Sequence, residues 1–132
     1  MRNALLVLLV FLIAACGAYR LPGASSGIGT VSGMVVAIPC SPIQPAQKAC
    51  AGRPVPELEI GYVNGGTTAK AVTDSNGKYS VDLSSGTWQV TLRTSMRVIS
   101  GPLEVTVSAG GTLTANYVLD SGMRIPTPIP QQ

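Results

Sequence analysis

Short runs in which apolar and polar residues alternate are the feature that most constrains how this chain can fold. Successive side chains of a β-strand point to opposite faces, so each run predicts a strand with one buried and one exposed face. Residue clusters typical of turns separate the runs: Asn64-Gly65-Gly66, Asp74-Ser75-Asn76-Gly77, Ser84-Ser85-Gly86 and Ala109-Gly110-Gly111. Because no segment beyond residue 29 has helical periodicity, the sequence predicts an all-β domain.

The runs predict seven strands, at residues 31–38, 58–62, 67–73, 78–83, 87–93, 103–107 and 113–119. Seven short strands with one apolar face each predict a seven-stranded antiparallel β-sandwich. Asn76-Gly77 is the strongest hairpin signal between them. Aromatic side chains in phase with the apolar positions are expected in the core: Tyr62, Tyr79, Trp88 and Tyr117.

The first sixteen residues have the pattern of a secretory signal: Arg2, an apolar stretch over residues 4–13, two alanines and Cys16. The stretch is too short to span a bilayer, which takes about 20 residues. The end of the segment resembles the lipobox of bacterial lipoproteins. This resemblance implies cleavage before Cys16, a thioether-linked diacylglycerol on its sulfur and an acyl chain such as palmitate on its amino group. A signal cut elsewhere, with Cys16 discarded, is the alternative.

The domain organisation follows from these segments. We expect a signal peptide at 1–15, the lipidated cysteine and a flexible Gly/Ser tether at 16–29, the β-sandwich at 30–120 and a Pro-rich disordered tail at 121–132.

Cys40 and Cys50 are the two cysteines that remain if Cys16 carries lipid. Exported chains are exposed to oxidising conditions, so the pair is expected to form a disulfide that closes a loop containing Pro42 and Pro45. Such a closure stabilises by roughly 3 kcal/mol on the chain-entropy description. Metal binding is the alternative, but the chain has no histidine and no second cysteine pair to complete a zinc site.

Two segments of the chain resemble the carboxypeptidase regulatory-like domain: Val-Thr-Asp-Ser-Asn-Gly-Lys-Tyr-Ser-Val at 72–81 and Gly-Thr-Trp-Gln-Val-Thr-Leu at 86–92. The resemblance covers residues 30–120 and implies a transthyretin-like, Ig-like Greek-key sandwich. In that family the domain usually serves as a folding, spacing or binding unit. One departure is Pro56-Glu57-Leu58, where the family more often has Pro-Gly-Ala, and the insertion between Cys40 and Cys50 is another.

Little in the sequence favours catalysis. Histidine, the commonest acid–base residue, is absent, and we expect no enzyme activity, no metal and no cofactor.

The charge of the chain is small. Loss of Arg2 with the signal lowers the formal net charge from +3 to +2, which is too small and too dispersed for nucleic-acid binding. Asp74 begins a segment resembling part of a calcium loop, but a turn is favoured because no downstream acid completes the ligand set. Four basic residues could together form a face for an anionic polymer, but an ordinary solvated sheet face is favoured: Lys70, Lys78, Arg93 and Arg97.

These observations predict a lipoprotein of the cell membrane or cell surface, held outside the cytoplasm by its lipid anchor. Its domain is expected to be a non-catalytic interaction or structural module of the cell envelope. Binding is expected at loops sharing one end of the sandwich, with Pro42, Pro45 and Asn64 as candidates. The partner would be an envelope protein or a glycan, and a carbohydrate-binding, starch-binding-like module is the alternative function.

Overall fold

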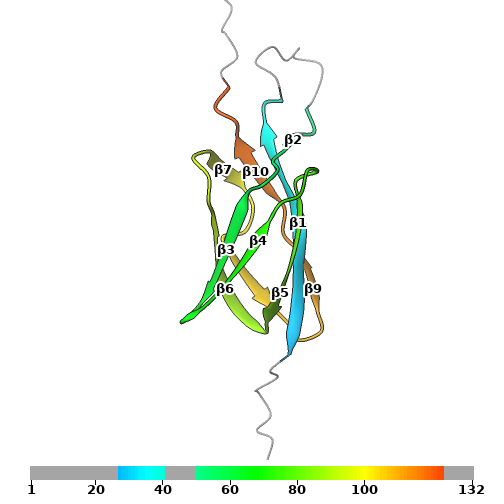
Figure 1. Cartoon of the computed structure of the whole chain (residues 1–132), viewed down its shortest axis with the longest axis vertical. Helices are drawn as coiled ribbons and strands as arrows, with labels where there is room; N and C mark the ends of the chain where they lie inside the picture. Colours follow the sequence, from blue (N-terminus) through cyan, green and yellow to red (C-terminus); the bar gives the residue numbers. More distant parts are fainter. Residues whose placement is uncertain (1–26, 41–49, 124–132) are drawn as a thin grey trace, which may run out of the picture.

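The computed structural model describes residues 27–40 and 50–123, and this part of the chain forms ten strands and no helix (Figure 1). The strands are β1 (Ile28–Ile38), β2 (Arg53–Pro54), β3 (Glu59–Asn64), β4 (Thr67–Val72), β5 (Lys78–Ser84), β6 (Gly86–Leu92), β7 (Arg97–Ser100), β8 (Glu104–Val107), β9 (Thr112–Thr114) and β10 (Tyr117–Asp120). Within these described residues, no helix of membrane-spanning length and hydrophobicity occurs.

Two sheets form a sandwich, which confirms the predicted all-β fold. One sheet has the order β4-β3-β6-β8, with every neighbouring pair antiparallel. In the other sheet β1 is central, and the order is β2-β1-β10-β7 with β5 and β9 also paired to β1. This second sheet is mixed, because β1 runs parallel to both β9 and β10. The sandwich thus has ten strands in place of the seven predicted, and two of its strand pairs are parallel.

The last predicted strand, 113–119, is divided into β9 and β10 where the chain passes the middle of β1. The Ala115 amide donates to the Ser32 carbonyl, and the Met34 amide donates to the Asn116 side-chain oxygen (2.9 Å). A side chain thus accepts the hydrogen bond that a strand carbonyl would otherwise accept. Both β2 and β7 were missed by the sequence analysis, and β2 has only two residues, too few to show alternation.

The core lies between the sheets and consists of side chains from both. It includes the four aromatic residues predicted to be buried, each with at most 5% of its surface exposed: Tyr62, Tyr79, Trp88 and Tyr117. Trp88 donates from its indole nitrogen to the Ser84 carbonyl (2.9 Å), so its polar atom is satisfied. The alternation in the sequence therefore predicted the inward face correctly.

Asn76-Gly77 forms a turn, but the predicted hairpin between its flanking strands is wrong. β4 belongs to the antiparallel sheet and β5 pairs with β1, so the turn carries the chain from one sheet to the other. Gly77 has a φ of 72°, and its amide donates to the Asp74 carbonyl (2.9 Å). Just before the turn, the buried Thr73 hydroxyl donates to the Val55 carbonyl (2.6 Å), and the Val55 amide donates to the Val35 carbonyl of β1 (3.1 Å), so the end of β4 is linked to the other sheet.

β1 runs the length of the sandwich, so its two ends mark the two ends of the domain (Figure 1). We call the end where β1 starts the N-terminal end. It consists of Gly27, Ile28 and three turns: 64–66, 84–86 and 108–111. The Ser85 amide donates to the Gly27 carbonyl and the Gly110 amide to the Ile28 carbonyl, which joins two of these turns to β1.

The opposite end, which we call the loop end, contains Cys40, Cys50, the turn at 73–77 and the end of β10. The eleven residues of β1 separate the two ends by about 36 Å at the usual rise of a strand.

Candidate functional site

The disulfide between Cys40 and Cys50 closes the connection from β1 to β2, as predicted, with 6.0 Å between the two Cα atoms. The residues just before Cys40 are held in place by Ser121, the residue that follows β10. Ser121 donates from its amide to the Ile38 carbonyl (2.8 Å) and from its hydroxyl to the Pro39 carbonyl (3.1 Å). A disulfide is typical of proteins outside the cytoplasm, so it indicates an extracytoplasmic domain.

Glu57 is the non-glycine residue with a positive φ (55°) in the described part of the chain. The Glu57 amide donates to the Thr73 carbonyl, and the Thr73 amide donates to the Leu58 carbonyl, so two residues face one in a β-bulge. Such a bulge favours glycine at its first position. Where the carboxypeptidase regulatory-like family more often has glycine, this chain has Glu57, whose exposed carboxylate therefore lies on a strained backbone at the loop end.

Asp74 organises the turn beside this bulge. Its carboxylate accepts from the amides of Asn76 (2.8 Å) and Lys78 (2.9 Å). These two hydrogen bonds are those of a turn, the interpretation that the sequence favoured over a calcium loop. Among the described residues, no group of three or more Cys, Asp or Glu side chains could hold a metal ion.

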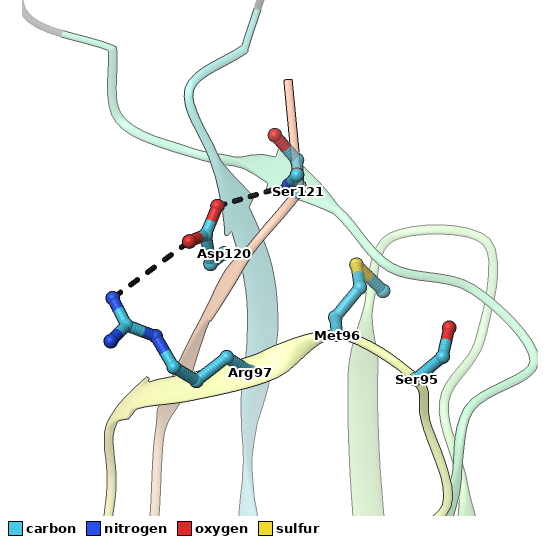
Figure 2. Close-up of a pocket in the computed structure, with 6 residues that line it drawn as sticks. Ser95, Met96, Arg97, Asp120 and Ser121 are labelled. Atoms are coloured by element: carbon cyan, nitrogen blue, oxygen red, sulfur yellow. Dashed lines mark hydrogen bonds and ion pairs between the residues drawn. The ribbon is translucent and has the colours of Figure 1, made fainter. Parts of the chain in front are cut away.

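A hollow of about 500 Å³ opens at the loop end between the start of β7 and the end of β10 (Figure 2). Four of its six lining residues have polar side chains, although polar and apolar atoms contribute about equally to its surface: Ser95, Met96, Arg97, Asp120, Ser121 and Gly122. Arg97 and Asp120 approach to 3.8 Å between a guanidinium nitrogen and a carboxylate oxygen, and the Gly122 amide donates to the same carboxylate (2.9 Å). The hollow therefore contains one charge of each sign, which contact each other, and two hydroxyls, of which that of Ser121 already donates to the Pro39 carbonyl. A small polar ligand would contact these groups in addition to their present partners.

The exposed charges lie on different parts of the surface, which agrees with the solvated face favoured from the sequence. Glu57 lies outside β3, whereas Glu59, the first residue of β3, contacts Lys70 (3.3 Å) and Arg93 (3.0 Å) across the outer face of the antiparallel sheet. Lys78 and Arg97 belong to the other sheet, so the four basic residues considered from the sequence form no single face.

The three core tyrosines lie close together. Tyr79 donates to the Ala115 carbonyl (2.6 Å) and Tyr117 to the Pro102 carbonyl (2.9 Å). The Tyr62 hydroxyl makes no hydrogen bond of normal geometry within the described residues, although the Tyr79 hydroxyl is near enough to influence its pKa. Burial raises the pKa of Tyr62 to about 12 and also raises the pKa of Tyr79 and Tyr117 above their ordinary value.

The candidate binding residues do not form one cluster. Asn64 lies at the N-terminal end, where its side-chain nitrogen would be 2.9 Å from a Cβ placed on Gly86. The expectation that it shares an end with the disulfide loop is therefore wrong. Cys16, Pro42 and Pro45 lie outside the described residues. Neither the hollow nor the contacts of Ser121 could be predicted from the sequence, since alternation says nothing about which strand ends converge. The presence of Glu57 at a position where the resembled family more often has glycine was the feature of the sequence that could have indicated the bulge.

No protein family and no curated protein matches the sequence. Among solved structures, the Bacillus anthracis TIE protein is similar with a TM-score of 0.53 at 11% identity, over 71% of this chain and 16% of that protein. The minor pilin GBS52 of Streptococcus agalactiae gives a TM-score of 0.48 at 17% identity, over 80% of this chain and 49% of the pilin. A DUF3823 family protein of Parabacteroides merdae gives 0.46 at 14% identity, over 72% and 47%.

The chain thus spans less than half the length of each of these three proteins. At such identities the similarity concerns the fold, and the first of the three supports the β-sandwich described above.

Proposed function

We propose that this chain is a lipoprotein of the cell envelope that presents the loop end of its sandwich to a partner. The observation that carries the proposal is the opposite placement of the start of β1 and the disulfide. Lipid on Cys16 would be joined to the start of β1 by residues 17–27, eleven residues that would span about 18 Å on average if flexible. The loop end would then lie roughly 36 Å further out, the length of β1.

The loop end has the properties of a recognition surface. It combines a covalently closed loop, the strained bulge at Glu57 and the polar hollow beside Asp120 on a rigid sandwich. Loops on rigid scaffolds commonly carry binding function, and backbone strain is often retained where function requires it. The resemblance to carboxypeptidase regulatory-like domains agrees with a non-catalytic interaction or structural module.

Carbohydrate binding is the second candidate, and the hydroxyls and charges of the hollow favour it. Against it, sugar sites usually have an exposed aromatic platform, whereas the described aromatic side chains are all buried in the core. An envelope protein is therefore the preferred partner.

Mass spectrometry of the protein extracted from membranes tests the anchor. The expected mass is that of a chain beginning at Cys16 with diacylglycerol and an acyl group, and Cys16→Ser should give a protein without these adducts. A wild-type mass without lipid would refute anchoring.

Photo-crosslinking in intact cells tests the display. A crosslinker at Ser75, in the turn of the loop end, should give a defined adduct with an envelope component, and one at Gly66 should not. Equal adducts from both positions would contradict recognition by the loop end. Retention on purified cell-wall polysaccharide, lost on Arg97→Ala, would instead support the glycan alternative.

A further inference from the structure

The N-terminal end of the sandwich differs from the rest of the described surface in its charge. Its twelve residues are Gly27, Ile28, Asn64, Gly65, Gly66, Ser84, Ser85, Gly86, Ser108, Ala109, Gly110 and Gly111, and none of these is charged. The loop end and the strand positions next to it have eight charged residues: Arg53, Glu57, Glu59, Asp74, Lys78, Arg93, Arg97 and Asp120. The two ends of one small domain thus present different surfaces.

The turns of the N-terminal end form one continuous surface. Gly27 approaches Ala109 so closely that a Cβ on Gly27 would be 2.1 Å from the Ala109 Cβ. Gly86 lies against Asn64, and Ser84 pairs with Ile28 in the register of β5 and β1. These contacts bring the start of β1 and all three turns together in a single uncharged cap.

Ile28 is an exposed apolar side chain in this cap, with 66% of its surface accessible. The nearest charge along β5 is Asp82, two residues from Ser84, and it accepts a hydrogen bond from the Thr30 hydroxyl (2.7 Å). The cap itself therefore brings no carboxylate that an anionic lipid surface would repel and no cation that requires a counter-ion.

We infer that this uncharged cap rests on the bilayer surface, with Ile28 at the level of the lipid headgroups, and holds the sandwich upright. The inference depends on the proposed lipid anchor at Cys16, because it is the anchor that brings the cap to the membrane. If residues 17–27 are the flexible tether that the sequence predicts, they span about 18 Å on average, so the local lipid concentration at the cap is high and weak contacts suffice. An apolar side chain among small polar residues suits an interfacial contact of this kind.

The arrangement would change how the protein recognises its partner. A domain on a free tether samples all tilts, whereas a docked domain directs the disulfide and the polar hollow away from the membrane at a fixed height. The cap would thus orient the loop end without making any contact with the partner.

Fluorescence quenching on vesicles tests the inference with the full lipidated protein. Gly66→Cys and Ser75→Cys each supply one free thiol for a dye, since the disulfide and the thioether occupy the other cysteines. The vesicles contain phosphatidylcholine, phosphatidylglycerol and a lipid with a spin label on its headgroup. We expect several-fold stronger quenching at residue 66 than at residue 75.

A second pair of variants separates docking from mere proximity. Ile28→Glu and, separately, Ala109→Glu place a carboxylate in the cap and should lower quenching at residue 66 at least twofold, with partial recovery in 0.5 M salt, where the screening length falls to about 4 Å. The control Asn76→Glu adds the same charge at the loop end and should leave quenching at residue 66 unchanged. Thermal melting of each variant shows that it is folded.

The outcomes separate the two claims. Protein that fails to sediment with vesicles would refute the anchor and the docking together. Protein that sediments but shows equal quenching at both sites, or a signal at residue 66 that neither Ile28→Glu nor Ala109→Glu lowers, would overturn docking and leave the anchor in place.

Discussion

Gly33 and Ala115 touch where β1 passes the interruption between β9 and β10: a Cβ built on Gly33 would be 1.9 Å from the Ala115 carbonyl oxygen. The same carbonyl accepts the hydroxyl of Tyr79 (2.6 Å). Because Gly33 has no side chain, the segment between β9 and β10 can lie close to β1, where its Ala115 carbonyl accepts the hydrogen bond of the buried Tyr79 hydroxyl.

Gly33→Ala should lower the free energy of unfolding by about 3 kcal/mol, because backbone on both sides must move to accept the methyl group. Gly61→Ala is the matched control, since its Cβ would meet only the Thr91 carbonyl at an ordinary 3.6 Å. The control should be neutral or slightly stabilising, as expected for alanine replacing glycine inside a strand. Equal urea midpoints for the two variants would contradict the close approach at Gly33.

Tyr62→Phe should leave stability unchanged or raise it by about 1 kcal/mol, because it removes a buried hydroxyl that lacks a hydrogen-bond partner. Tyr79→Phe should destabilise by roughly 1–3 kcal/mol, because it leaves the Ala115 carbonyl without its partner. Denaturant unfolding of the two variants gives the comparison, and a larger loss for Tyr62→Phe than for Tyr79→Phe would be inconsistent with the hydrogen bonding described.

Glu57→Gly should stabilise the domain by about 0.5 kcal/mol. Relief of the left-handed backbone is worth about 1–2 kcal/mol, and the greater freedom of glycine in the unfolded chain offsets part of it. Glu57→Ala keeps the strain and removes the charge, so it should be close to neutral. Differential scanning calorimetry would separate them, and a gain with alanine equal to that with glycine would assign the effect to charge.

Alkaline pH should destabilise the domain through its core tyrosines. Their pKa is raised in the folded state, that of Tyr62 to about 12, so the folded chain binds protons that the unfolded chain loses near pH 10. Stability should thus be unaffected by these groups below about pH 9 and fall above pH 10, by about 1.4 kcal/mol per pH unit for each tyrosine still protonated in the fold. Urea melts from pH 8 to pH 12 measure this, and Tyr62→Phe should reduce the slope between pH 10 and pH 12.

Opening the disulfide should cost about 3 kcal/mol, since the two cysteines are ten residues apart and their bond restricts the unfolded chain. Cys40→Ser combined with Cys50→Ser should melt at the same temperature as wild-type protein in reducing buffer. A wild-type melting temperature that does not respond to reductant would contradict the stabilising role of this bond.

The sequence predicted the fold class and the core because both depend on alternation, which is local. Trp88, Tyr79 and Leu83 were assigned to the inner face and are buried there. The hairpin at Asn76-Gly77 was predicted wrongly because the turn residues fix only the local bend, whereas the pairing of β5 with β1 depends on residues more than 40 positions apart.

The candidate site was predicted less well, since it depends on which strand ends converge. The parallel pairing of β1 with β10 brings Ser121 to Pro39, two residues that are 82 positions apart. Nothing in either local sequence indicates this contact. The disulfide was the exception, because counting cysteines needs no knowledge of topology.

The parallel alignment of β1 and β10 also has a mechanical consequence. β1 begins at one end of the domain and β10 finishes at the other, with four residue pairs in register between them. If the chain is anchored as proposed and a partner pulls at the end of β10, the tension would act along both strands from opposite ends, so these pairs would be loaded in shear and would have to rupture together instead of unzipping one by one. A domain connected in this way is suited to bearing force.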